Sequence, residues 1–461
     1  MASTRKRNKS TRSDKSSILK GREEIHEAKS SVISPECQIY LTLGGAFLFS
    51  CLCTALIWYV FLRERGIEYT TIHTVPVISL PDQEAPFAGA AIKNGEPLII
   101  RNSIINKWHA RKLWSPRYLR SKLERLDGNP LPGRYHYLTS DIDQLGEWAF
   151  GDVEPIDELL SPNPSRSSIN VWIGQPNVIA HTHYDGYHNF YAQLYGTKKF
   201  TLLRPTQWPG LYPYPFLHPS HAQAQVNLSR LEDAKEFPLS SRLEVYEVTL
   251  EPGDLLYMPP LWFHYVESLS ISISVNVWTD SEQSILMEKA FGLPLPLDQV
   301  KWHGEHLRAI AGSMLTVSLV DRVCKARECP LTDKYNINET EFKNGGQYFM
   351  FKLWQGRYSK LMKRNEIHSS FSSKNGRRNS LLCENSALPS LFFQGISQNL
   401  YKAPVEEYLT KITRLMMKLP RDSWELWFGN YVEFVAAQSV DLLDVGLFLK
   451  HYDSCSMHFP K

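Results

Sequence analysis

Short apolar segments separated by turn residues fill the middle of the chain and predict β-strands there. We expect strands over residues 169–173, 178–183, 190–194, 198–203, 245–250, 254–258 and 271–278. These segments are rich in β-branched and aromatic residues, and Gly174, Gly186, Gly196 and Pro252-Gly253 separate them. Many short strands with such turns are typical of an antiparallel barrel or jelly roll.

A helical spacing of apolar residues, every three or four positions, replaces this pattern after Thr279. The expected helices cover residues 281–291, 303–326, 405–419 and 424–449. Residues 87–160 mix helical signals with short strands. We therefore predict a mainly β domain with flanking α-helices over residues 87–280, followed by a helical C-terminal region over residues 281–461.

A run without charges near the N-terminus predicts a transmembrane helix. Residues 37–62 contain no charged side chain, and about 20 apolar residues suffice to cross a bilayer. A cleaved signal peptide and a buried core helix are the alternatives, but the run is long and follows a polar tail, residues 1–36. Because that tail is basic, we expect it to stay in the cytosol. The prediction is a single-pass type II membrane protein with a stem over residues 66–86 and its body in the lumen of the endoplasmic reticulum or secretory pathway.

The charge balance argues against a nucleic-acid partner. Lysine and arginine number 51 against 48 aspartate and glutamate, and residues 1–36 hold 9 of the basic and 5 of the acidic side chains. The rest of the chain is therefore nearly neutral and lacks the basic footprint of a nucleic-acid surface. Seven cysteines are too few for a disulfide scaffold. Four of them lie in the body and would allow two disulfides: Cys324, Cys329, Cys383 and Cys455.

Two of the expected strands carry residues that suit a metal ion. Side chains two apart in a strand point the same way, so His183 and Asp185 project together. His264, near another strand, is the candidate third ligand. Two histidines and one carboxylate leave positions open on a metal, which suits Fe(II) that binds a cosubstrate and oxygen. The ordinary alternative for His264 is a core histidine with a structural role.

These residues and the segments around them resemble a known family. His183 and Asp185 are followed by residues 189–193, 196–200 and 252–259, then by His264 and residues 274–278. In this order they resemble the JmjC, cupin-like family of Fe(II)- and 2-oxoglutarate-dependent oxygenases. The match is nearest to the small hydroxylase branch, which includes the asparaginyl hydroxylase of hypoxia-inducible factor. The resemblance covers roughly residues 75–280 and implies a double-stranded β-helix core of the jelly-roll or cupin type.

The resemblance also implies roles for individual residues. It makes His183, Asp185 and His264 the iron ligands, and it pairs Lys198 with the distal carboxylate of 2-oxoglutarate. Further roles are for Tyr137 at the same carboxylate, Asn189 and Asn276 beside metal and cosubstrate, and Gln223 at the substrate. By strand alternation Lys199 lies on the other face, and we expect Tyr184, Tyr187 and Tyr191 to pack. Ala180 and Ala222 replace a threonine and an arginine of the asparaginyl hydroxylase, so its substrate does not carry over.

The implied activity is hydroxylation of a substrate, expected to be a protein side chain, with release of succinate and CO2. Two other functions remain open: a cupin-fold binding module without catalysis, and a JmjC demethylase if the domain faces the cytosol. A zinc or manganese cupin would explain the three ligands but not Lys198. The C-terminal helices are expected either to form a homodimer, as in the resembling hydroxylase, or only to cover the barrel.

Overall fold

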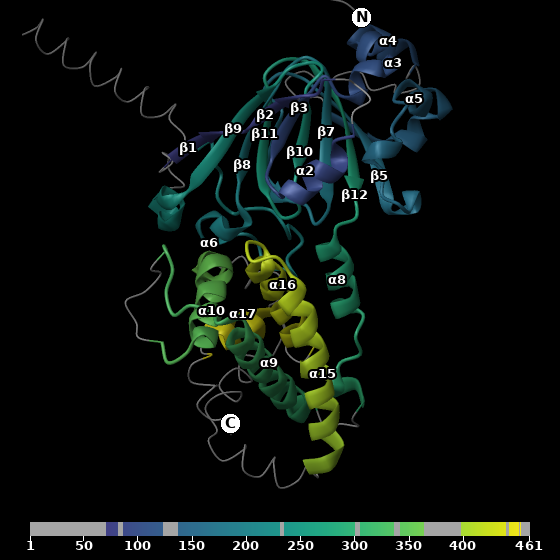
Figure 1. Ribbon diagram of the computed structural model, residues 1–461. Helices are drawn as coiled ribbons and strands as arrows, with labels where there is room; N and C mark the ends of the chain where they lie inside the picture. Colours follow the sequence, from purple (N-terminus) through teal and green to yellow (C-terminus); the bar gives the residue numbers. More distant parts are fainter. Residues whose placement is uncertain are drawn as a thin grey trace, which may run out of the picture. The chain divides into compact units, whose positions relative to one another are not determined.

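The computed structural model describes residues 71–81, 86–122, 137–230, 235–299, 305–335, 342–363, 398–438, 442–450 and 452. All of them belong to one compact unit, Arg63–Lys461. It contains two β-sheets, and the C-terminal helices gather at one end of them (Figure 1). This sheet-rich, jelly-roll-like core with helices is the architecture that the strand pattern predicts.

The first sheet has five strands and contains the segments expected to hold the metal. In spatial order they are β1 (Thr71–Thr74), β9 (Glu244–Leu250), β8 (Lys198–Leu203), β11 (Phe263–Ser268) and β6 (Ile179–Tyr184). The β1–β9 pair is parallel, and the other neighbours are antiparallel. The alternation of β8 places Phe200 and Leu202 in the core between the sheets, where both are fully buried.

The second sheet has seven strands. Their order is β2 (Val77–Ser79), β3 (Leu98–Arg101), β10 (Leu255–Met258), β7 (His188–Tyr195), β12 (Ser272–Thr279), β5 (Ser167–Gly174) and β4 (Tyr137–Asp141). Only the β2–β3 pair is parallel. Since β1 and β2 fall within the segment expected as a stem, residues 71–79 of that segment form edge strands of the two sheets.

Four short helices pack with the second sheet in one apolar cluster: α2 (Ala88–Asn94), α3 (His109–Leu113), α4 (Pro116–Lys122) and α5 (Glu147–Asp152). Short 3-10 helices cover Ile104–Lys107, Ile142–Leu145, Asp157–Leu159, Pro164–Arg166, Pro205–Gln207, Pro238–Arg242 and Pro296–Gln299. The cluster includes Trp108 and Trp114, whose indole rings are buried. The C-terminal region packs instead against the five-stranded sheet.

The C-terminal region is helical, as expected. Its helices are α8 (Glu282–Phe291), α9 (Glu305–Arg327), α10 (Gly345–Leu353), α11 (Ser359–Lys363), α15 (Gln398–Lys418), α16 (Trp424–Ala437) and α17 (Leu442–Lys450), with a π-helix at Trp354–Tyr358 and α6 (Trp208–Leu211) beside it. The single helix expected over residues 424–449 is thus two elements, α16 and α17. A shared apolar cluster joins these helices to Tyr184, Leu203 and Phe263 of the first sheet. A disulfide links Cys324 to Cys329, and Cys383 and Cys455 lie outside the described residues.

The expected transmembrane helix is not supported. In the part of the chain that the structure describes, no helix is long and apolar enough to cross a membrane. The charge-free run, residues 37–62, lies outside the described residues. The longest described helices are amphipathic: α9, for example, carries Arg308 and Arg322 in surface ion pairs while its apolar side chains enter the core. The prediction of a single-pass type II protein with a lumenal body is corrected accordingly.

Candidate functional site

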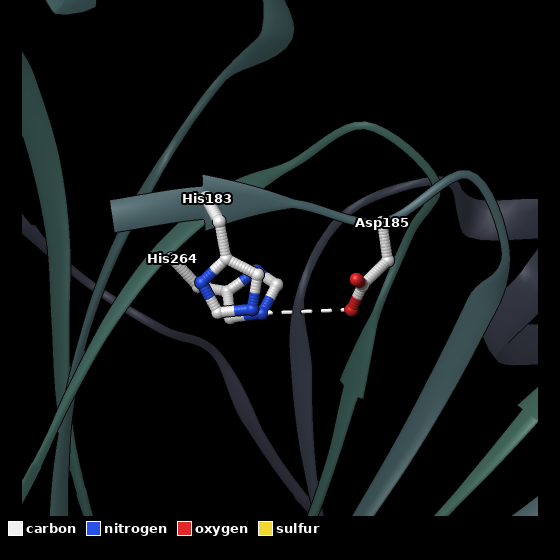
Figure 2. Close-up of side chains that lie close together, drawn as sticks. All are labelled: His183, Asp185 and His264. Carbon is white, nitrogen blue, oxygen red and sulfur yellow. Dashed lines mark ion pairs between the residues drawn. The ribbon is translucent and has the colours of Figure 1, made fainter. Parts of the chain in front are cut away.

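The three expected metal ligands converge at one edge of the five-stranded sheet. His183 is the penultimate residue of β6, Asp185 follows that strand directly, and His264 lies near the start of β11. The antiparallel pairing of the two strands sets His264 directly opposite His183. One ligand atom from each residue lies within 4.8 Å of the others, and Figure 2 shows the three side chains pointing toward one another. The separation of these donors is suitable for one metal ion.

Both imidazoles are held in the tautomer that a metal requires. Nδ1 of His183 lies 2.7 Å from the carbonyl oxygen of His181, and Nδ1 of His264 lies 3.1 Å from that of Trp262. A carbonyl can only accept, so each Nδ1 carries the proton and each Nε2 keeps its lone pair. The Nε2 of His264 lies 3.6 Å from Asp185 Oδ2. Burial, together with the neighbouring His183, lowers the pKa of His264 to about 4, which favours the neutral form that binds metals.

A chain of hydrogen bonds from the second sheet reaches the carboxylate. Trp172 Nε1 donates to Asn276 Oδ1 at 2.6 Å, and Asn276 Nδ2 donates to Asn189 Oδ1 at 3.0 Å. Asn189 Nδ2 in turn lies 3.5 Å from Asp185 Oδ2, at the long limit of a hydrogen bond. The structure therefore places both expected asparagines behind Asp185, on β7 and β12. Trp172 on β5 completes the chain and was not among the expected residues.

Lys198 is buried at the start of β8 and lacks a carboxylate partner. Its side chain is 1% exposed, and its ammonium donates to the hydroxyl of Tyr191 at 2.6 Å. Among the described residues no acidic group pairs with it, and burial lowers its pKa to about 7. A buried ammonium with a hydroxyl but no counter-ion fits an anionic ligand such as a carboxylate. Lys199 lies on the other face, where it pairs with Glu247 at 2.9 Å.

Tyr191 and Tyr137 come from the second sheet, and Tyr191 contacts this ammonium. The ring of Tyr191 packs on Phe200, as expected of a packing residue, but its hydroxyl also accepts the hydrogen bond from Lys198. Tyr137 on β4 lies beside Trp172, with ring centroids 5.9 Å apart, and is near enough to Tyr191 to raise the pKa of that phenol, after burial itself. The structure thus places Tyr137 near the tyrosine that bonds Lys198, and its side chain is 43% exposed.

Gln223 lies beside the metal ligands on the outer edge of β6. The segment around it runs antiparallel to that strand, with Gln223 opposite His183 and Ala224 N–H donating to the Thr182 carbonyl at 2.8 Å. Because His264 flanks His183 on the other side, Gln223 and His264 bracket the ligand strand. The side chain of Gln223 is exposed, as a substrate contact requires.

A cavity of about 680 Å³ opens next to Asp185. Its lining comes from the barrel, the loop before Gln223 and helices α8 and α16, and includes Tyr187, His221, Trp278, Met287, Phe291, Trp427 and Asn430. A second hollow of about 330 Å³ shares Tyr187, Trp278 and Glu288 with it. Five aromatic rings contribute to its lining, and the cavity is large enough for an amino-acid side chain with part of its backbone.

The similarity to known proteins includes the strand-rich part of the chain. A family described as "Cupin-like domain" matches residues 133–285. "Jumonji C domain-containing protein 5" of Drosophila melanogaster is 36% identical over 150 residues, which is 31% of this chain and 35% of that protein. "Lysine-specific demethylase JMJ30" of Arabidopsis thaliana is 30% identical over 185 residues, 40% of this chain and 42% of the relative.

A human relative is named for two activities. "Bifunctional peptidase and (3S)-lysyl hydroxylase JMJD7" is 27% identical over 174 residues, 34% of this chain and 52% of that protein. The chain thus spans about a third to a half of the length of these relatives. The similarity is to their shared domain, and what each relative acts on belongs to that relative.

Proposed function

Because residues 133–285 form a cupin-like domain of the JmjC family of oxygenases, we propose that this chain is an Fe(II)- and 2-oxoglutarate-dependent oxygenase that hydroxylates a protein side chain. The observation that supports this most is the combination of two features on neighbouring strands of the five-stranded sheet, β6, β11 and β8. His183, Asp185 and His264 present three metal donors, and Lys198 presents a buried cation without a counter-ion. Zinc or manganese chemistry would use the first feature and leave the second unexplained.

Each part of the chain has a distinct task in this proposal. His183, Asp185 and His264 would hold Fe(II) on one side and leave its other positions open. When bound, Fe(II) and 2-oxoglutarate supply the activation of oxygen that inserts one oxygen atom into a C–H bond and releases succinate and CO2.

The cosubstrate needs a cation because burying its distal carboxylate alone is costly. Lys198 would donate to that carboxylate, and Tyr191 holds the ammonium in place through their 2.6 Å hydrogen bond. Asn276 and Asn189 orient Asp185 toward the metal. The substrate side chain would enter the cavity beside Asp185, with Gln223 at its rim.

Among protein side chains, lysine is the substrate to consider next. Two of the relatives carry lysine chemistry in their names, and the cavity combines aromatic rings with the carboxylate of Glu288. Rings and a carboxylate attract cations. Glu288 is already engaged by Arg166, whose Nη2 lies 2.8 and 2.9 Å from its two oxygens. We therefore keep the proposal at the level of a protein side chain.

The direct test is the visible charge-transfer band of an Fe(II)–2-oxoglutarate chelate. The full chain is loaded with Fe(II) without oxygen and titrated with 2-oxoglutarate, with His183→Ala and Lys198→Ala as variants. We expect a band in the parent, none in His183→Ala, and a much higher 2-oxoglutarate requirement in Lys198→Ala. Iron binding without a band at any concentration would instead favour a non-catalytic cupin-fold module.

A further inference from the structure

The turn that carries Asp185 is held from outside the barrel by the C-terminal helices. Ser281, the N-cap residue of α8, donates its hydroxyl to the carbonyl of Gly186 at 3.0 Å. On the same turn, a Cβ added to Gly186 would lie only 3.1 Å from Cη2 of Trp427 on α16. The indole ring therefore rests directly on the turn, and a larger residue at position 186 would require that ring to shift.

The third contact reaches the residue between the two ligands of β6. Tyr184 alternates away from His183 and Asp185, and its side chain is buried against the helices. Nδ2 of Asn430 on α16 donates to the Tyr184 hydroxyl at 3.2 Å. Because Tyr184 is bonded directly to both ligand residues along the backbone, fixing its side chain restricts where they can lie.

A buried ion pair determines how Asn430 is oriented. Arg357 Nη1 donates to Asn430 Oδ1 at 2.8 Å and to Glu433 Oε1 at 2.7 Å. Arg357 is 1% and Glu433 0% exposed. An amide whose oxygen is bound by a guanidinium must direct its NH2 group elsewhere, and here it is directed at Tyr184. The ion pair thus acts on the turn through one amide.

The same ion pair also holds the loop that runs along β6. Glu433 Oε2 accepts the backbone N–H of Phe216 at 2.6 Å, and Gln225 Nε2 donates to the Arg357 carbonyl at 2.8 Å. Gln223 lies between these two anchor points and pairs with His183. The ligand segment is therefore tied to one buried cluster twice, through the side chain of Tyr184 and through the loop along its outer edge.

We propose that Asn430, Arg357 and Glu433 are positioning residues that fix Asp185 relative to the two histidines and so set the affinity of the metal site. A buried ion pair seldom stabilises a fold more than apolar residues of the same size would, so stability alone does not account for it. Replacing a group that hydrogen-bonds to a metal ligand commonly lowers metal affinity by an order of magnitude or more. Asn430, Arg357 and Glu433 act one step further out, through Tyr184 and the loop beside β6. This role rests on the proposed function, because it requires that His183, Asp185 and His264 bind a metal.

The test uses Co(II), whose absorption spectrum reports ligand geometry, on the full chain without oxygen or 2-oxoglutarate. Tyr184→Phe and Asn430→Ala each remove the hydrogen bond between these two residues, and neither leaves a buried charge without its partner. We expect each variant to bind Co(II) about five- to tenfold more weakly, with a changed spectrum. Both changes break the same hydrogen bond, the one between Asn430 and Tyr184. The double variant should therefore bind Co(II) no more weakly than the single variant with the lower affinity.

Lys352→Met is the matched control. Lys352 is buried in the same helical region and pairs with Asp333 at 3.0 Å and Glu425 at 2.7 Å. In the part of the chain that the structure describes, the side chains of Lys352, Asp333 and Glu425 form no hydrogen bond with Tyr184 or Gly186. Its replacement should lower the Tm at least as much as Asn430→Ala while the Co(II) affinity and spectrum stay unchanged.

The outcomes separate this role from the proposed function. A parent chain that binds Co(II) no better than its His183→Ala variant would overturn the proposed function, and the positioning role with it. A parent that binds Co(II) normally, with both single variants unchanged or their effects strictly additive, would overturn the positioning role alone. An equal loss of affinity in Lys352→Met would do the same, because it would show that general destabilisation is sufficient.

Discussion

His183 and His264 face each other across the β6–β11 pair, with ring centroids 4.1 Å apart. Side chains in a strand alternate, so a slip of one residue in either strand would turn one imidazole to the opposite face. The pairing is interrupted by a bulge immediately after His264 and resumes at Val266 with Ala180. Strand register, more than loop conformation, therefore brings the two imidazoles together.

Replacing Lys198 should mainly affect the cosubstrate. We expect Lys198→Ala to bind 2-oxoglutarate roughly 10- to 100-fold more weakly, because a charge-assisted hydrogen bond in a buried pocket is lost. Titration of the visible band of the Fe(II) chelate measures this. Lys199→Ala is the control, since that side chain pairs with Glu247 on the other face. Equal affinities in both variants would contradict a role for Lys198 at the carboxylate.

The pH dependence of 2-oxoglutarate binding should follow the ammonium of Lys198. Burial lowers its pKa to about 7 in the free protein, and a bound carboxylate would raise that pKa again. Binding then takes up a proton above pH 7, so affinity falls as pH rises. We expect about fivefold weaker binding at pH 8 than at pH 7.

Calorimetry in buffers of different ionisation enthalpy would detect this proton uptake. The matched variant is Lys198→Arg, whose guanidinium keeps its proton throughout this range. Its affinity, whatever its absolute value, should not change between pH 7 and pH 8. A parent chain with the same flat profile would contradict the prediction.

Removing Asn276 should weaken both the fold and the metal site. In Asn276→Ala the indole of Trp172 and the amide oxygen of Asn189 lose their partner, which should lower the free energy of unfolding by about 1–3 kcal/mol. With Asp185 less well oriented, Co(II) should bind about tenfold more weakly. Asn170→Ala provides the comparison, because Asn170 pairs with Asn276 in the strand register, while its side chain, among the described residues, bonds only Ser168. It should leave Co(II) affinity unchanged.

The turn before Lys198 should not tolerate a side chain. Gly196 has φ of +66°, and a Cβ there would collide with the carbonyl oxygen of Ile271. We expect Gly196→Ala to lower the free energy of unfolding by about 3 kcal/mol or more. Gly151→Ala should be neutral or slightly stabilising, since Gly151 lies in α5 with nothing within 4 Å of an added Cβ. Denaturant unfolding of the two variants gives the comparison.

Strand alternation was sufficient to predict which side chains share a face. It places His183 with Asp185 and separates Lys198 from Lys199 from the sequence alone, because a period of two is a local property of the backbone. The roles that the family resemblance implies remain predictions for the three metal ligands and Lys198 as well as for Tyr137, Asn189, Asn276 and Gln223.

Contacts that depend on distant packing could not be predicted in this way. Tyr191 and Lys198 belong to different sheets, so only the closed barrel brings the hydroxyl to the ammonium. Asn430 bonds Tyr184 across 246 positions of sequence. No periodicity in either segment indicates that contact, because it depends on how α16 docks onto the sheet.

The apolar cluster shared by the first sheet and the C-terminal helices affects how the chain can be divided. A chain shortened to end at residue 280 would still contain all three metal donors and Lys198. It would also expose part of the apolar surface around Trp208, Leu211 and Phe263, since more than half of the buried residues in their cluster lie beyond that point. The strand-rich part is therefore not an independent domain. Fused alone to another protein, it would carry an exposed apolar surface that favours aggregation.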